Sequence, residues 1–230
     1  MQIAGLQKLT LLDYPETVAC TVFLAGCNFR CPFCHNAALV TEKSDPTMSS
    51  EELLSFLEKR QGVLEGVAIT GGEPLLYSEL PCLLKQIKNL GYKIKLDTNG
   101  SKPEALQTLI DQNLVDRVAM DVKASPEIYS KAVGINDYDL TAVTRSKNIL
   151  LNSNIEYEFR TTVVKGIHTI ASMIELAKWI KGAKEYYLQQ FKDSGNLISA
   201  DGLSAYNAEE MKLIADSVRQ YVPTVKLRGI

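Results

Sequence analysis

Residues 18–34 read VACTVFLAGCNFRCPFC and contain two features that decide the fold. Residues 18–24 are mostly apolar and β-branched on both faces, a pattern typical of a strand buried in a parallel sheet. Three cysteines, Cys27, Cys31 and Cys34, follow directly after it. The sequence therefore predicts that a cysteine-rich loop leaves the C-terminal end of the first buried strand.

Three thiols in one loop are an informative number of ligands. A structural zinc site needs four ligands and a disulfide needs two, whereas a 4Fe-4S cluster held by three thiolates keeps one iron free. We expect the chemistry at that open iron. Two simpler interpretations remain: Cys31 and Cys34 could form a redox-active dithiol, and the three cysteines with His35 could bind zinc.

The composition limits the compartment and the partners. The chain has 230 residues with 46% hydrophobic content, which is enough for one substantial core in a single domain over residues 1–230. Its 25 basic and 27 acidic residues form no basic run, so we expect no nucleic-acid partner. The odd cysteine count favours a reducing cytoplasm, and no apolar run is long enough to span a membrane.

Strand and helix patterns alternate along the whole chain. The expected strands lie at residues 18–24, 66–70, 92–97, 115–122, 157–164, 185–191 and 225–227. The expected helices, with their capping residues, lie at 49–60, 78–90, 103–113, 140–151, 169–181 and 207–221. Such alternation indicates an α/β fold with parallel strands and right-handed crossovers.

The length decides between a complete and a partial barrel. Eight βα units typically need about 250 residues, so about six units favour a partial (β/α)6 barrel over residues 18–230. We expect residues 1–17 to form a short strand or hairpin that covers one end of the core.

Unusual polar motifs follow three of the expected strands. They are Gly71-Gly72-Glu73-Pro74, Asp97-Thr98-Asn99-Gly100 and Asp121-Val122-Lys123. Each alone fits an ordinary turn. Because the C-terminal ends of parallel strands share one rim, we expect the three motifs to meet the cysteine loop there.

Together these motifs resemble the radical S-adenosylmethionine (SAM) enzymes. The Cys-x3-Cys-x2-Cys loop with Phe33 before its last cysteine, followed by the strand-terminal Gly-Gly-Glu-Pro, carries this resemblance. Residues 5–15, Cys34-His35-Asn36 and Met120-Asp121-Val122-Lys123 are similar to the glycyl-radical-enzyme activases. Among these, the anaerobic ribonucleoside-triphosphate reductase activating proteins are the most similar.

The resemblance implies both cofactors. Cys27, Cys31 and Cys34 would hold a 4Fe-4S cluster whose fourth iron is chelated by SAM. One electron from a donor such as flavodoxin or ferredoxin would then release methionine and a 5′-deoxyadenosyl radical, the cofactors carrying the hard chemistry. Phe33 would pack beside the adenine, and the segment Gly71, Gly72, Glu73 and Pro74 would bind the methionine amino group.

The resemblance also assigns roles to polar residues at the other strand ends. Asp97, Thr98 and Asp121 would bind a monovalent cation, for which hard oxygen ligands are suitable. Asn99 and Lys123 would contact the cofactor, although Lys123 could equally be solvated. For Arg160 the argument comes from the residues themselves: alternation along residues 158–164 could point it into the barrel, where a buried arginine needs a partner, either the cofactor or a structural ion pair.

Several single residues have simpler interpretations. We expect Cys20 and Cys82 to be packed thiols, Trp179 to be a packing residue and His168 to be a surface or capping residue. We expect His35 to hydrogen-bond near the cluster. Some activases carry a cofactor-contacting histidine where this chain has Gln189 and Gln190.

These observations lead to three hypotheses about function. The first is a radical SAM activase that takes a hydrogen atom from a glycine of a glycyl radical enzyme, most similar to the activase of anaerobic ribonucleotide reductase. The second is a radical SAM enzyme for a small molecule, such as the deazaguanine-forming enzymes. The third is a non-catalytic iron-sulfur or zinc protein.

Overall fold

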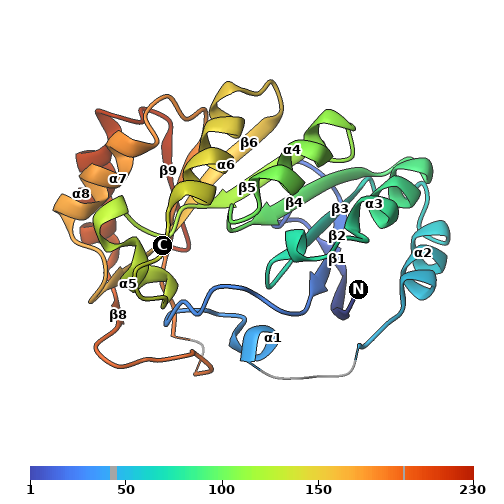
Figure 1. Ribbon diagram of the computed structural model, residues 1–230, viewed down its shortest axis with the longest axis horizontal. Helices are drawn as coiled ribbons and strands as arrows, with labels where there is room; N and C mark the ends of the chain where they lie inside the picture. The colour runs from blue at the N-terminus through green and yellow to red at the C-terminus, as the bar shows by residue number, and fades with distance from the viewer. Residues whose placement is uncertain (42–45, 194) are drawn as a thin grey trace. The chain divides into compact units, whose positions relative to one another are not determined.

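The computed structural model of the chain describes residues 1–41, 46–193 and 195–230 (Figure 1). These residues divide into two compact units. Unit 1 comprises Met1–Asn28, Ala38–Thr98 and Lys102–Ala119. Unit 2 comprises Phe29–Ala37, Asn99–Ser101 and Met120–Ile230. A single domain over the whole chain stays a prediction.

Unit 1 is built on four neighbouring strands. They are, in spatial order, β1 (Ile3–Thr10), β2 (Ala19–Leu24), β3 (Gly66–Gly71) and β4 (Lys93–Thr98). Strands β2, β3 and β4 are parallel, as their apolar sequences predict. Every residue of β2 except Phe23 is buried.

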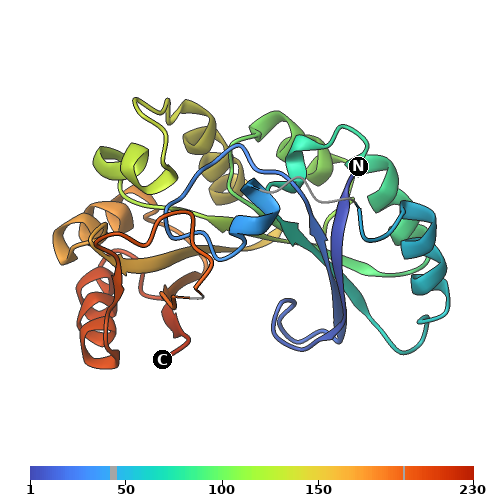
Figure 2. The same ribbon diagram turned by 90° about the horizontal axis from the view of Figure 1, so that it is seen from below.

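The N-terminal segment forms the short strand that the sequence predicts. Strand β1 pairs with β2 in antiparallel register, with Leu6 opposite Val22, and its role as a cover over one end of the core stays a prediction. The turn that joins the two strands is dark blue in Figure 2. Only Ile3 and Thr10 of β1 are buried. A segment with so few buried side chains can join the fold by hydrogen-bonding the free edge of β2 rather than by packing on a core.

Helices follow the strands of unit 1. They are α2 (Ser50–Glu58), the short 3-10 helix η1 (Pro74–Leu76), α3 (Leu80–Asn89) and α4 (Pro103–Asp111). Ser49 caps α2, because its side chain accepts from the Glu52 N–H and the Glu52 carboxylate accepts from the Ser49 N–H. Helices α2 and α3 lie side by side (Figures 1 and 2).

Unit 2 contains a second set of parallel strands. They are β6 (Glu156–Lys165), β7 (Tyr186–Gln190) and β9 (Val225–Arg228), and the two-residue β8 (Ser204–Ala205) runs antiparallel to β6. The helices are η2 (Pro126–Ile128), α5 (Tyr129–Val133), α6 (Thr141–Asn152), α7 (Ile170–Trp179) and α8 (Ala208–Arg219). Thr169 and Asn207 cap α7 and α8, as predicted, and these two helices lie side by side (Figure 1).

Two elements contain residues of both units. Strand β5 (Arg117–Asp121) gives its first residues to unit 1 and its last two to unit 2, and α1 (Ala37–Thr41) follows the cysteine loop. The expected alternation of strands and helices is confirmed. The short α1, α5, η1 and η2 were not predicted, because so few residues show no helical period. No helix in the described residues is long and apolar enough to cross a membrane.

Candidate functional site

The cysteine loop begins in unit 1 and continues in unit 2. Cys27 belongs to unit 1, whereas Cys31 and Cys34 belong to unit 2. The Gly26 N–H donates to the Leu39 carbonyl (2.7 Å), and this bond anchors the loop within unit 1. The Arg30 N–H donates to the Val133 carbonyl (2.8 Å), and this bond anchors the loop within unit 2. None of these three described cysteines forms a disulfide bond; Cys31 is buried and the other two are half-buried. Each part of the loop is thus fixed by main-chain bonds within its own unit.

The Gly-Gly-Glu-Pro segment packs directly against the start of this loop. The Gly72 N–H donates to the Leu24 carbonyl and the Glu73 N–H donates to the Gly26 carbonyl, both at 2.8 Å. A Cβ on Gly72 would lie 1.8 Å from the Gly26 oxygen, and one on Gly71 would lie 2.3 Å from the Leu24 oxygen. Both glycines are therefore required for the close approach of two backbones.

The Glu73 side chain has a structural role within unit 1. It is fully buried, and its Oε1 accepts from the Leu75 N–H (3.1 Å) and from the Thr98 hydroxyl (2.8 Å). Pro74, also buried, opens η1. Glu73 therefore ties the end of β3 to the end of β4.

Asp97 has a cationic partner that the sequence analysis missed. Lys95 lies two residues earlier on β4, is only 1% exposed, and its Nζ pairs with the Asp97 carboxylate. Alternate residues of a strand share a face, so the spacing of the two residues was the signal that could have found this pair. Asp97 and Thr98, predicted cation ligands, therefore each have a partner within the protein.

Asn99 makes the turn after β4. It is buried, and its Oδ1 accepts from the Ser101 N–H at 2.9 Å, which is an Asx turn. Gly100 between them has a φ of 75°. The structure thus gives Asn99 a role in the turn, and its contact with the cofactor stays a prediction.

Asp121 is the centre of an ion-pair network in unit 2. Its two oxygens accept from Arg160 Nε (2.8 Å) and Lys123 Nζ (2.9 Å). Burial alone would raise the pKa of Asp121, but the charges of Arg160 and Lys123 outweigh it and hold this pKa well below its usual range. Arg160 therefore has the ion-pair partner that the sequence analysis required.

Lys123 connects this network to the cysteine loop. Burial alone would lower the pKa of Lys123, but the Asp121 carboxylate, followed by the Cys31 and Cys34 thiolates, raises it above its usual range. Lys123 therefore places a positive charge near the sulfur atoms of Cys31 and Cys34.

His168 is buried, and the prediction of a surface or capping residue is wrong. His168 is 1% exposed. Its Nδ1 accepts a hydrogen bond from the Val164 N–H (3.0 Å). Because Nδ1 is the acceptor, Nε2 carries the proton and donates to the Lys123 carbonyl (2.8 Å). Burial lowers the pKa of His168. The side chain also makes an edge contact with the buried ring of Phe33, at 6.3 Å between centroids. His168 thus holds the backbone of Lys123 and packs beside the cysteine loop.

The remaining predicted residues have local roles. The His35 ring lies 5.8 Å from that of Phe191, and burial, followed by the charge of Lys123, lowers the pKa of His35. Gln190 donates to the Tyr206 carbonyl at 2.8 Å, while Gln189 is half-buried on β7. Trp179 packs against Tyr129.

The two cysteines outside the loop differ from each other. Cys20 is fully buried, and burial raises its pKa to about 12, as a packed thiol requires. Cys82 is exposed on α3, so the prediction that it is packed is wrong. Its helix buries Leu80, Leu83, Leu84 and Ile87, and position 82 falls outside that stripe.

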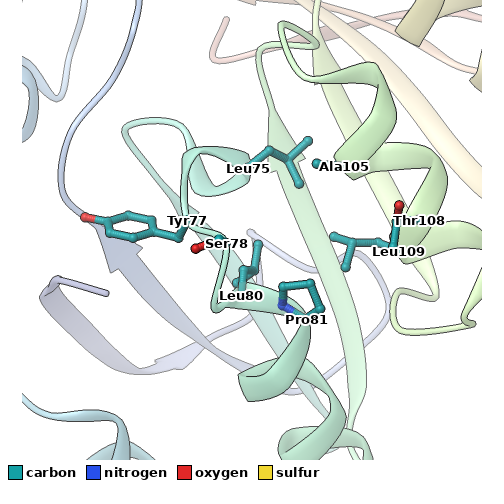
Figure 3. A pocket seen from close by; sticks show the side chains of 8 residues that line it. All are labelled: Leu75, Tyr77, Ser78, Leu80, Pro81, Ala105, Thr108 and Leu109. Atoms are coloured by element: carbon teal, nitrogen blue, oxygen red, sulfur yellow. The ribbon is translucent and has the colours of Figure 1, made fainter.

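A pocket of about 210 Å³ lies in unit 1 between η1, α3 and α4 (Figure 3). Three leucines, a proline and an alanine make up most of its lining, and the other lining residues are Tyr77, Ser78 and Thr108. The Tyr77 hydroxyl points away from the pocket and donates to the Ala25 carbonyl at 2.9 Å (Figure 3). None of the eight described residues that line it is charged. Such a wall offers no charged group to the amino and carboxylate groups of SAM, and none of the predicted site residues lines it.

Comparison with known families gives the decisive match. The sequence pattern of the radical SAM superfamily matches residues 21–180. The chain belongs to the radical SAM superfamily. Enzymes of this family use a 4Fe-4S cluster and SAM, so the non-catalytic iron-sulfur or zinc interpretation is wrong.

Individual radical SAM proteins resemble the chain to different extents. "Putative glycyl-radical enzyme activating enzyme MJ1227" of Methanocaldococcus jannaschii is 27% identical, over 99% of this chain and 96% of that protein. A 7-carboxy-7-deazaguanine synthase of Hyperthermus butylicus is 39% identical, but over only 39% of this chain and 38% of that protein. Streptococcus suis SuiB bound to SAM has a TM-score of 0.71 at 13% identity, over 91% of this chain and about half (52%) of SuiB, which shows the shared fold.

The residues present fit the cofactors of this family. The loop supplies three thiols, Lys123 supplies positive charge near two of them, and the Gly71-Gly72 segment lies directly beside the start of the loop. Cys27 belongs to unit 1 and the other two cysteines to unit 2, and no group of three or more His, Cys, Asp or Glu side chains in the described residues is gathered closely enough to hold a metal ion. The binding of one cluster by all three cysteines therefore stays a prediction. The monovalent cation at Asp97, Thr98 and Asp121 stays a prediction.

Replacing Gly72 should test the close backbone contact. We expect Gly72→Ala to lower the free energy of unfolding by about 3 kcal/mol, because the new methyl group meets the Gly26 carbonyl. Gly5→Ala is the matched control, since a Cβ there meets Phe23 at an ordinary 3.6 Å, and it should change stability by less than about 0.5 kcal/mol. Urea unfolding of the cluster-free protein measures both. Equal stability of the two variants would contradict the proposed constraint.

The neutral state of His168 predicts a pH dependence of stability. Its pKa is below 6.5 in the folded protein and near 6.5 in the unfolded chain, so only the unfolded chain binds the proton between these values. Stability should therefore fall as the pH drops from about 7 towards 5, by at most about 1.4 kcal/mol per pH unit for this residue.

His168→Gln should flatten that dependence. The chain has two histidines, and His35→Gln serves as the comparison, since it leaves His168 in place. Urea titrations at several pH values measure the slope. An unchanged slope in His168→Gln would show that His168 has the same pKa in the folded and unfolded states, and would contradict the lowered pKa.

Proposed function

We propose that the chain is a glycyl-radical-enzyme activating enzyme. The observation that carries this proposal is the match over nearly the whole length of both chains to the M. jannaschii protein of that name. The deazaguanine synthase shares less than half of its length with this chain. A match to the whole chain includes the parts that recognise the substrate, whereas a short match can reflect the cofactor site alone.

In this proposal the cysteine loop and the strand ends form the cofactor site. Cys27, Cys31 and Cys34 bind the cluster, and the backbone of Gly71 to Pro74 binds the methionine amino group of SAM. The contacts of Gly72 and Glu73 with the start of the loop support this assignment, because they hold the segment next to the residue before Cys27. Phe33, a buried residue of the loop, packs against the adenine.

The charged residues of unit 2 orient the cofactor. Lys123, with Arg160 beside it, presents positive charge to the SAM carboxylate, while Asp121 holds both cations in place. His168 fixes the backbone of Lys123. When bound, the cluster and SAM supply a carbon-centred radical strong enough to take a hydrogen atom from a glycine Cα. The protein positions these groups and keeps water away.

We propose that the substrate is the glycine loop of an anaerobic ribonucleoside-triphosphate reductase. The similarity of residues 5–15 and 120–123 to the activases of that enzyme supports this choice. The electron comes from a low-potential donor such as flavodoxin or ferredoxin. We place the reaction in the cytoplasm, where reducing conditions protect an iron-sulfur cluster.

Formation of the glycyl radical tests the proposal. Reconstituted protein, reductant and SAM are incubated without oxygen with the anaerobic reductase of the same organism, and electron paramagnetic resonance (EPR) records the radical. We expect a glycyl radical signal, with one 5′-deoxyadenosine formed for each radical. Cys31→Ala should abolish it, while Cys82→Ala, the same change at an exposed cysteine, should preserve it. Cleavage of SAM without a glycyl radical in the partner would contradict the assignment.

The 39% identity to a deazaguanine synthase over 91 residues supports a second candidate, a radical SAM enzyme for a small molecule. It predicts that SAM cleavage is stimulated by a purine-like substrate rather than by a partner protein. Comparing 5′-deoxyadenosine formation with the reductase and with the precursor of 7-carboxy-7-deazaguanine distinguishes the two.

A further inference from the structure

We propose that Lys95 is the internal counter-ion of Asp97, and that the chain therefore binds no monovalent metal cation at Asp97. The inference deepens the cofactor site proposed above and rests on it. It replaces the external cation that the sequence analysis expected at Asp97 with a side chain of the protein itself.

The burial of Lys95 carries the inference. Its side chain is 2% exposed and that of Asp97 is 14% exposed, and the Nζ atom of Lys95 pairs with Oδ1 of Asp97. A buried ammonium group is costly unless it is paired and hydrogen-bonded. Position 95 is buried like its neighbours Ile94 and Leu96, which lie on the other face of β4. An apolar residue could fill this position, but the chain has a lysine there.

The position of the pair connects it to the cofactor site. Asp97 is followed by Thr98, whose hydroxyl donates to Glu73 in the Gly-Gly-Glu-Pro segment. Lys95 thus neutralises the carboxylate of Asp97, and the next residue, Thr98, contacts the segment proposed to bind SAM. We therefore assign Lys95 as a positioning residue that acts through Asp97.

An ammonium group and a metal cation would compete for the same carboxylate. Both carry one positive charge and both bind carboxylate oxygens, so a second cation beside Lys95 would be repelled. The ammonium group belongs to Lys95, only two residues before Asp97 in the same strand, so its effective concentration at the Asp97 carboxylate is high. This favours the ammonium group over metal ions in solution. The lysine therefore makes the site independent of the salt composition.

Removing the ammonium should create the missing cation site. Lys95→Met leaves the Asp97 carboxylate in a mostly buried position without this partner, so potassium or sodium should then bind it and stabilise the variant. Lys93→Met is the matched control, since Lys93 lies on the same strand and face but is exposed.

The first measurement is thermal unfolding of the cluster-free protein in potassium, sodium or tetramethylammonium chloride at equal ionic strength. The Tm of the wild type and of Lys93→Met should be the same in all three salts. The Tm of Lys95→Met should be about 2–4 °C higher in potassium or sodium than in tetramethylammonium. If Lys95→Met does not fold, Lys95→Gln takes its place, because it removes the charge but keeps a hydrogen-bond donor.

The second measurement is SAM binding by the reconstituted protein in the same salts. The dissociation constant of the wild type should be the same in potassium and in tetramethylammonium, whereas that of the Lys95 variant should be about tenfold weaker in tetramethylammonium. SAM binding that strengthens with potassium in the wild type, or a Lys95 variant with the same Tm in every salt, would overturn the inference. Thermal unfolding involves neither SAM nor a partner, so a failure of glycyl radical formation leaves this test intact.

Discussion

The close contact between the ends of β2 and β3 is the constraint on which the candidate site depends. The N–H groups of Gly72 and Glu73 donate to the carbonyls of Leu24 and Gly26, and the space between the two backbones is too small for a Cβ. Cys27 follows Gly26 directly. The same hydrogen bonds therefore fix the start of the cysteine loop and the segment proposed to bind SAM, before any cofactor is present.

A second feature of the site is that cationic side chains of the protein neutralise its two aspartates. Asp97 pairs with Lys95 within unit 1, and Asp121 pairs with Lys123 and Arg160 within unit 2. Each carboxylate holds its cationic partner in a defined position, which lowers the cost of burying both charges. Lys123 gains a further role, since its charge also acts on the thiolates of the cysteine loop.

The sequence predicts the features that depend on local pattern. Buried parallel strands are continuous apolar runs, and the caps at Ser49, Thr169 and Asn207 are short-range hydrogen bonds, so both were predicted correctly. The two wrong predictions have different causes. His168 is buried because it reaches the carbonyl of Lys123, which no local pattern reveals. Cys82 is exposed because it lies outside the apolar stripe of α3, which the spacing of the neighbouring leucines did indicate.

The central claim is that three thiolates hold a cluster whose open iron binds SAM. EPR of the anaerobically reconstituted, reduced protein, recorded with and without SAM, tests it most directly. The account predicts the signal of a reduced 4Fe-4S cluster and a shift of that signal when SAM is added, because SAM becomes a ligand of the fourth iron. A protein without a cluster, or a cluster signal that SAM leaves unchanged, would contradict the account.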